Sequence, residues 1–145
     1  MSIKDQIAIF KSLGFGELDV RHIGVYVKPC VQAESGKLKE THKIYIGEGN
    51  GDFKVDYPTQ FIFVSMNQEW VFESFDLAGK TWPGLAIFPD NGDFSIKFGD
   101  SKQYSIVLND ACTAFCAHRY QVVMKNKTTG EIIATDPSVE NGDRD

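Results

Sequence analysis

The sequence has no long apolar run, no basic cluster and few cysteines, and each of these absences excludes a class of protein. No stretch approaches the ~18 consecutive apolar residues of a membrane-spanning helix. The formal net charge is −5, and no segment is basic enough to form a phosphate-binding face. We therefore expect neither nucleic acid nor an anionic membrane as a partner. Three cysteines, an odd number, fit a reducing compartment better than a disulfide framework.

The first residues also lack the order of a secretory signal peptide, because Asp5, Lys11 and Glu17 interrupt the apolar side chains. We therefore expect a cytoplasmic protein. A chain of 145 residues corresponds to about one domain, which is large enough to bury a core without disulfides or metals.

Only the N-terminal segment, residues 1–16, carries a helical period. Ile3, Ile7 and Phe10 fall on one face, and Gly16 ends the pattern. The segment predicts a short helix, although its central apolar run is also compatible with a buried strand.

From Arg21 to Thr135 the hydrophobic period changes to two, which is typical of strands. The expected strands are residues 22–28, 41–47, 60–66, 70–75, 85–89, 94–98, 104–110, 118–126 and 131–135. The run 60–66 is apolar on both faces, as in a central strand. Short strands separated by turn residues predict an all-β fold, specifically an immunoglobulin-like antiparallel β-sandwich spanning residues 1–137. Residues 138–145 are polar and acidic, and they predict a disordered tail.

The sequence Asn-Gly-Asp-Phe occurs twice, at Asn50–Phe53 and at Asn91–Phe94. Asn-Gly supplies the two positive-φ residues of a type I′ turn, so each copy predicts a β-hairpin between the strands on either side. A third Asn-Gly-Asp, at Asn141, follows the last expected strand. The flanking sequences share little else, which argues against an internal repeat.

Two groups of residues raise the question of a metal site. Cys112, Cys116 and His118 place two thiols and an imidazole within seven residues. A fourth ligand would have to come from a distant residue such as His22, His42 or Cys30. Zinc sites more often use two cysteines separated by two residues, so we interpret both cysteines as small buried side chains.

The second group consists of carboxylates in glycine-rich loops, namely Glu48, Asp52, Asp90, Asp93 and Asp100. Neither loop has the ligand order of an EF-hand, and we interpret these residues as turn acids rather than as a weak calcium site. We expect no metal and no cofactor.

Trp70 and Trp82 are candidate ligand-binding residues, because an exposed indole on a sandwich can stack on a sugar ring. The alternative is that both tryptophans lie in the core between two sheets, as in immunoglobulin-like folds.

The most distinctive stretch runs from His118 to Gly142, HRYQVVMKNKTTGEIIATDPSVENG. It predicts a strand containing Tyr120, a Lys-Thr-Thr-Gly turn, and a last strand that ends at Asp136 and Pro137. Asp110 stands upstream, where a sandwich turns into its penultimate strand, and Tyr120 there is suited to a tyrosine corner. This ending resembles small bacterial proteins of the DP-EP family, whose function is uncharacterised. The resemblance implies a single immunoglobulin-like β-sandwich and supplies no catalytic residues.

No nucleophile elbow, zinc-protease motif, P-loop or dinucleotide fingerprint is present. We therefore expect a non-enzymatic module for protein interaction or self-association. A small-ligand or carbohydrate-binding sandwich is the alternative, and a small hydrolase-like enzyme is the third hypothesis. Sandwiches leave open edge strands, of which Pro29 and Pro137 blunt two. The remaining edges predict a homodimer.

Overall fold

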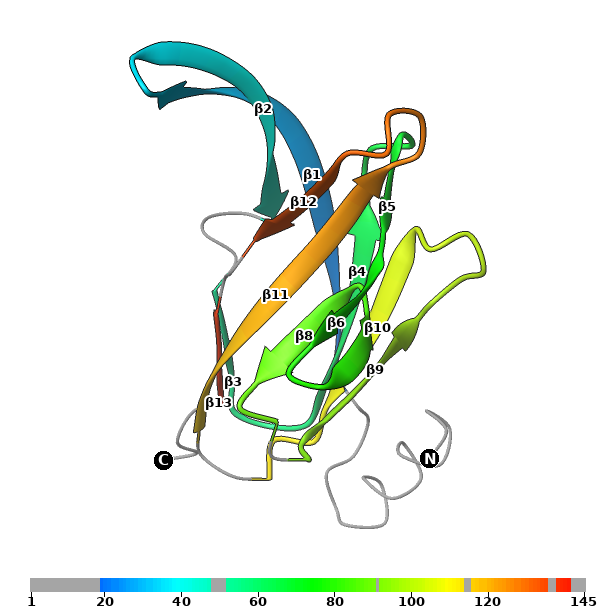
Figure 1. Cartoon of the computed structure of the whole chain (residues 1–145). Coiled ribbons are helices and arrows are strands. Elements are labelled where there is room, and N and C mark those ends of the chain that lie inside the picture. The colour runs from blue at the N-terminus through cyan, green and yellow to red at the C-terminus, as the bar shows by residue number, and fades with distance from the viewer. Residues whose placement is uncertain (1–18, 48–51, 91, 114–115, 136–137, 142–145) are drawn as a thin grey trace.

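The computed structural model describes residues 19–47, 52–90, 92–113, 116–135 and 138–141, and this part of the chain is all-β (Figure 1). It contains thirteen strands and no helix. The all-β prediction is thus confirmed, while the helix expected over residues 1–16 lies outside the described residues. Within the described ranges, no helix is long and apolar enough to cross a membrane.

The first sheet has five strands, and its order places the predicted central strand in the middle. In sheet order they are β2 (Lys37–Ile46), β1 (Asp19–Glu34), β4 (Thr59–Ser65), β10 (Ser105–Asp110) and β9 (Phe94–Phe98). The pair β1–β4 is parallel, in the register Asp19↔Thr59 to Val25↔Ser65. The prediction of a purely antiparallel fold is therefore wrong, because an alternating pattern specifies which face a side chain takes and not the direction of the neighbouring strand.

The second sheet is organised around the long strand β11 (Cys116–Asn126). One edge of β11 pairs with β13 (Ser138–Asn141) and then with β12 (Ile132–Thr135). The other edge pairs with β8 (Leu85–Phe88) and then with β5 (Trp70–Phe72). Strand β3 (Phe53–Val55) adds to β13 in parallel. A separate two-stranded ribbon consists of β6 (Ser74–Leu77) and β7 (Lys80–Pro83).

Strand β13 corrects the prediction that the chain is disordered from residue 138. Residues 138–141 pair with β11 on one side and with β3 on the other. Backbone hydrogen bonds hold this segment, and they are available to a polar sequence as much as to an apolar one. Composition alone therefore underestimated its order. Residues 142–145 lie outside the described part.

One hydrophobic core joins the two large sheets. Its fully buried side chains come from both of them and include Val25, Phe61, Phe63, Ile106, Leu108, Phe72, Leu85, Ile87, Tyr120, Val122 and Met124. Tyr120 lies near its centre, with ring centroids 6.1 Å from Phe53 and 6.0 Å from Phe63. Face-to-face burial of aromatic and branched side chains is the dominant stabilising contribution in such a fold.

The described strands on either side of the two Asn-Gly-Asp-Phe segments do not pair with each other, so the hairpin prediction is also wrong, and residues 50, 51 and 91 themselves lie outside the described part. Gly92 has a φ of +85°, as a turn requires, but β8 and β9 on either side of it belong to different sheets. The copy at residues 50–53 likewise stands between β2 and β3, which are in different sheets. Positive φ is a local property, and it reverses the chain without determining which strands pair.

The two-residue type I′ turns lie elsewhere, at Ser35-Gly36 and at Ala78-Gly79. All four residues have positive φ, and the flanking residues pair as Glu34↔Lys37 and Leu77↔Lys80. Glycine in the second position supplied the only sequence signal for them.

Candidate functional site

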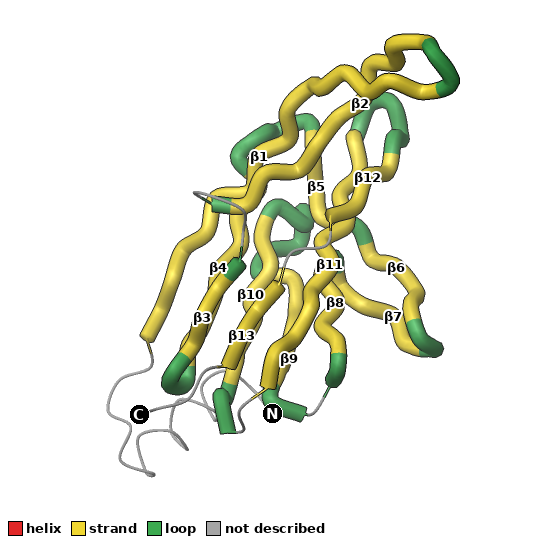
Figure 2. Tube along the Cα trace, turned by 90° about the vertical axis from the view of Figure 1, so that its left-hand side faces the viewer, coloured by secondary structure: helices red, strands yellow, loops and turns green. Residues whose placement is uncertain are grey.

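The most unusual feature of the described chain is a two-stranded β-hairpin that projects from the body (Figures 1 and 2). Strands β1 and β2 remain paired from Val25↔Ile46 to Glu34↔Lys37. On its other edge β1 pairs with β4 only as far as Val25. We refer to residues 29–42 as the β-arm.

A side-chain hydrogen bond marks the point where β4 leaves β1. The Met66 N–H donates to the Val25 carbonyl oxygen at 2.8 Å, and the Val27 N–H then donates to Oδ1 of Asn67 at 2.7 Å. Asn67 thus satisfies the first donor that lacks a neighbouring strand. Pro29, the next residue on this edge, has no N–H to satisfy. Its position agrees with the expectation that Pro29 lies at a strand edge.

The same alternation shows which groups of the β-arm remain open. Because Val25 and Val27 direct their backbone groups toward β4, the odd-numbered residues that follow them point to the same edge. Val31 and Ala33 therefore present backbone N–H and C=O groups with no strand beside them among the described residues.

The β-arm has one apolar face and one polar face. Val25 and Val27 of β1 and Ile44 and Ile46 of β2 are buried in the core. The alternation continues this face into the β-arm, where its residues are Pro29, Val31, Ala33, Leu38, Glu40 and His42. Val31 is 60% exposed and Leu38 is 80% exposed. The core-facing side of the sheet therefore extends beyond the core that covers it.

A cleft of about 420 Å³ lies at the base of the β-arm. Its lining residues are Val27, Pro29, His42, Met66, Asn67, Gln68, Glu69 and Trp70. Met66 is 53% exposed and offers an apolar wall, whereas Trp70 is buried and tilted against His42 with ring centroids 5.1 Å apart. Because Val27, Pro29 and His42 share one side of the β1–β2 pair, the cleft lies on the apolar side of the β-arm.

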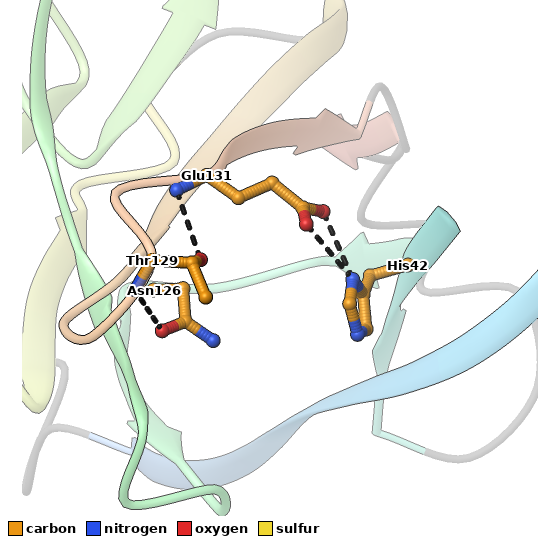
Figure 3. A network of polar contacts seen from close by, with 4 residues as sticks. All are labelled: His42, Asn126, Thr129 and Glu131. Carbon is orange, nitrogen blue, oxygen red and sulfur yellow. Dashed lines mark hydrogen bonds and ion pairs between the residues drawn. The ribbon is translucent and has the colours of Figure 1, made fainter. Parts of the chain in front are cut away.

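A contact between a histidine and a carboxylate connects the base of the β-arm to the second sheet (Figure 3). Nδ1 of His42 lies 2.9 Å and 3.2 Å from the two carboxylate oxygens of Glu131. Both side chains are about one-third exposed, so the pair contributes little stability and mainly fixes position.

The predicted Lys-Thr-Thr-Gly turn positions Glu131 for this contact. Oδ1 of Asn126 accepts hydrogen bonds from the N–H groups of Thr128 and Thr129, at 2.9 Å and 3.0 Å. Oγ1 of Thr129 in turn accepts from the Glu131 N–H at 3.3 Å. The turn is therefore closed by side chains, and it holds the start of β12 beside β2.

The structure does not bring the two tryptophans together. Trp70 lies on β5 and Trp82 on β7, and each is 4% exposed. Nε1 of Trp82 donates to the Leu77 carbonyl oxygen at 3.1 Å, and the ammonium group of Lys80 lies 4.2 Å from the ring centroid. Neither indole presents an open ring face of the kind that stacks on a sugar, although Trp70 does line the cleft.

The residues of the thiol–imidazole cluster have other partners. Cys112 is buried, and its Sγ lies 3.4 Å from the Val55 carbonyl oxygen. Nδ1 of His118 lies 2.8 Å from the Pro89 carbonyl oxygen, and its ring packs edge-on against Phe94. The side chain of Cys116 lies outside the described part. Within that part, no group of three potential metal-ligating side chains occurs.

The loop carboxylates accept hydrogen bonds from turns. Asp90 accepts from the Gly92 N–H at 3.3 Å. Asp93 is buried and accepts from both the N–H and the hydroxyl group of Thr113. Asp100 accepts from Ser105. Asp52 is exposed, and Glu48 lies outside the described residues.

Among the described residues, Asp100 and Tyr120 have shifted pKa values. Burial works against ionisation of Asp100, but hydrogen bonds from the Ser105 hydroxyl and from neighbouring N–H groups hold the pKa of this carboxyl below its usual value. Burial, with a smaller contribution from the charge of Asp52, raises the pKa of Tyr120. The phenol of Tyr120 therefore remains protonated in the core.

The other residues of the C-terminal motif are structural or not described. Asp110 is buried and accepts a hydrogen bond from the Cys112 N–H at 2.8 Å. Asp136 and Pro137 lie outside the described residues.

Sequence reasoning missed the β-arm because it ended one strand at residue 28 and began the next at residue 41. The residues between them read as a polar loop. The available signal was Ser35-Gly36, a turn dipeptide flanked by residues that continue the alternation on both sides.

Comparisons with known proteins identify no family. No family model matches the chain, and no curated protein is significantly similar to it. Among solved structures, the chain is similar to an inclusion body protein, PixA, from Burkholderia cenocepacia J2315. The two are 10% identical, the match covers 84% of this chain and 94% of that chain, and the TM-score is 0.33. A score at this level does not establish a shared fold.

Proposed function

We propose that this chain is a non-enzymatic protein-interaction module that forms a homodimer through its β-arm. The observation that carries the proposal is the exposed apolar face of the β-arm, with Val31 60% and Leu38 80% accessible. Complete burial of such a side chain contributes about 1.5–3 kcal/mol. Apolar residues that gather on a projecting element mark an interaction site rather than ordinary surface.

The charge distribution is compatible with a second copy of the chain that binds through its β-arm. The β-arm contains two lysines and two glutamates and therefore carries no net charge. Because the whole chain carries −5, the remainder of the chain also carries −5. Two acidic bodies repel each other, so association through the neutral β-arms is the less opposed arrangement.

The open backbone groups of the β-arm support the same proposal. Val31 and Ala33 expose main-chain donors and acceptors on one edge, and the opposite edge belongs to the sheet-edge strand β2. Unpaired strand edges bind other chains readily unless a protein blocks them. Sugar binding has less support, because both indoles are shielded.

In the same proposal the two main sheets form an immunoglobulin-like β-sandwich of a cytoplasmic protein. The shared core between the sheets supports this assignment. So does the resemblance of the C-terminal residues to the DP-EP family. The parallel pairs β1–β4 and β13–β3 depart from the antiparallel pairing expected of such a sandwich.

Sedimentation equilibrium tests the proposed dimer. At tens of micromolar, the wild-type chain should sediment at about 32 kDa, twice its mass of 16.2 kDa. Val31→Asp should shift it to the monomer, because a buried unpaired carboxylate opposes association. Val20→Asp is the matched control, since Val20 is on the same strand, is 44% exposed and lies outside the β-arm. A monomeric wild type, or equal loss of dimer in both variants, would overturn the proposal.

A further inference from the structure

The outer face of the β1–β2 hairpin, opposite the apolar face of the β-arm, combines lysines with exposed tyrosines. We infer that this face binds single-stranded nucleic acid, with the tyrosine rings stacking on bases and the lysines contacting phosphates. The inference goes beyond the proposed function, because it concerns the side of the hairpin that the proposed dimer leaves open. We refer to this surface as the lysine–tyrosine face, and its residues are Tyr26, Lys28, Lys37, Lys39, Lys43 and Tyr45.

Strand pairing brings together residues that lie far apart along the chain. Tyr26 on β1 lies directly opposite Tyr45 on β2. In the same way, Lys28 lies directly opposite Lys43. The alternation of the strands places all four on the side away from the core, where each is exposed. The expectation that nucleic acid is not a partner considers charge along the chain, whereas the sheet adds charge across two strands.

The lysine–tyrosine face is basic although the chain as a whole is acidic. Along this side of residues 20–46, all of them described, Glu34 is the one acidic side chain, and it lies 3.9 Å from Lys39. Four lysines and one glutamate give this side a net charge of +3. The β-arm is neutral in total because Glu40 lies on its other face and because Lys28 and Lys43 precede and follow it. Charges more than about 10 Å apart are largely screened at physiological salt, so the local charge governs the approach of a phosphate chain.

Two of these lysines repel each other in the free protein. Like charges directly opposite each other destabilise a strand pair, yet Lys28 and Lys43 form such a pair. Their ammonium groups lie 5.3 Å and 5.5 Å from the centroid of one ring, that of Tyr45. A phosphate bound beside both ammonium groups would relieve the repulsion. Residues that oppose a local rule of stability are expected at binding sites.

The two tyrosines form a platform on the sheet surface. Tyr26 is 39% exposed and Tyr45 is 38% exposed. Gly24 leaves room for the first ring, because a Cβ there would lie 3.2 Å from Cε2 and 3.3 Å from the hydroxyl oxygen of Tyr26. Exposed aromatic rings on β-strands stack on unpaired bases. A free phosphate or a lipid headgroup would require the lysines alone, so the paired rings favour single-stranded nucleic acid.

Fluorescence anisotropy of a labelled oligothymidylate tests the inference. We expect a dissociation constant of about 1–100 μM at physiological salt, the range of sequence-independent contacts. Tyr26→Ala or Tyr45→Ala should weaken binding by at least about fivefold, because one stacked base contributes that much or more. Tyr57→Ala is the matched control, since Tyr57 is 49% exposed and lies outside the hairpin, and it should leave the dissociation constant unchanged. Equal effects of all three substitutions would overturn the platform.

A salt titration tests the lysines. The double variant Lys28→Gln, Lys43→Gln removes two phosphate contacts. The slope of the logarithm of affinity against the logarithm of salt concentration should therefore become shallower by about 1.4, or about 0.7 for each contact with a single strand. Lys54→Gln combined with Lys97→Gln is the matched control, because both lysines are exposed and lie on β3 and β9, outside the hairpin. An unchanged slope in the first double variant would overturn the phosphate contacts.

An abasic oligomer of equal length separates stacking from attraction by charge. It should bind at least about fivefold more weakly than oligothymidylate, because it offers no bases to the tyrosines. Equal affinity for the two oligomers would overturn the role of the rings. No rise in anisotropy up to about 100 μM protein, or binding only to vesicles that contain phosphatidylserine, would overturn the whole inference.

Sedimentation of the same variants distinguishes this inference from the proposed function. The substituted side chains lie on the face opposite the proposed dimer contact, so each variant should keep the sedimenting mass and the circular dichroism spectrum of the wild type. A monomeric wild type that binds oligothymidylate would overturn the dimer and support the lysine–tyrosine face. A dimeric wild type that does not bind it would overturn this inference and leave the dimer intact.

Discussion

The hairpins at the two ends of the five-stranded sheet differ in what covers them. Strand β9 places Phe94, Ile96 and Phe98 half-buried against the core. Strands β1 and β2 begin in the same way, but beyond Pro29 their apolar face has no core beneath it. Both hairpins follow the same alternation of apolar and polar residues. Alternation therefore identifies the inward face of a hairpin, whereas the covering layer decides whether that face is buried in a core or left exposed.

The turns of the two hairpins also differ in the interactions that hold them. In the β9–β10 loop, Oδ1 of Asp100 accepts hydrogen bonds from both the N–H and the hydroxyl of Ser105, each at 2.8 Å. The turn at the tip of the β-arm depends on backbone conformation at Ser35 and Gly36. The covered hairpin is thus held by side chains as well as by its ladder.

Truncating one leucine in the core and one in the β-arm should give the largest difference in the free energy of unfolding. Leu108 on β10 is fully buried, and Leu108→Ala should lower the free energy of unfolding by about 2–5 kcal/mol through lost burial and an unfilled cavity. Leu38→Ala in the β-arm should change it by less than about 0.5 kcal/mol. Urea denaturation, at concentrations where the chain is monomeric, measures both. A cost above about 1 kcal/mol for Leu38→Ala would show that the β-arm folds back onto its own body.

Alanine substitutions at one glycine in the covered region and one in the β-arm give the next largest expected difference. Gly84 and Gly36 have nearly equal φ values, +78° and +77°. A Cβ at Gly84 would lie 2.7 Å from Cδ1 of Ile106 and 2.8 Å from Cβ of Phe72, whereas at Gly36 it meets no described atom within 4 Å. Backbone strain is common to both, so Gly84→Ala should cost about 1–3 kcal/mol more than Gly36→Ala. Equal shifts in urea midpoint would mean that the sheets adjust freely around Gly84.

Asn67 lies where β1 leaves the covered part of the sheet and enters the exposed β-arm. Asn67→Ala removes the acceptor of the Val27 N–H and should cost about 1–2 kcal/mol in the monomer. Asn67→Asp retains a side-chain oxygen and should cost less. Amide hydrogen exchange at Val27 provides a second readout, since that proton should exchange faster in the alanine variant alone. Unchanged protection there would show that the hydrogen bond does not secure the junction.

The smallest expected effect concerns pH. The pKa of Asp100 is lowered in the folded protein, so its contribution to stability is present above the unfolded pKa. That contribution is lost as pH falls through the folded value, which means below about pH 4. Asp100→Asn should therefore reduce the melting temperature at neutral pH and converge with wild type in acid. A constant difference between the two chains across this range would contradict the assigned role of Asp100.

Sequence patterns predicted the faces of this fold better than its pairings. Phe61 and Phe63 alternate as a central strand should, and the Lys-Thr-Thr-Gly turn forms where the sequence indicates. Pairing depends on partners far away along the chain, as for β1 with β4, and no local signal encodes it.

The candidate site illustrates the same difference. The sequence predicts Trp70 as a candidate ligand-binding residue, but the cleft that it lines depends on the meeting of β1, β2 and the segment after β4. The sequence does not identify the β-arm as a site, because the exposure of the Leu38 side chain depends on where the core ends. An apolar residue in an alternating run does not indicate where the core ends.

The β-arm also has a place in the order of folding. Its residues pair locally, with Glu34 opposite Lys37, so the hairpin requires nothing beyond residue 46. Strand β4 comes later, and β10, which completes the sheet around it, ends only at Asp110. Local contacts form faster than distant ones, and chains grow from the N-terminus on the ribosome. A nascent chain therefore contains the β-arm before it has a body, and under the proposed dimer neighbouring chains on one message would meet through it during translation.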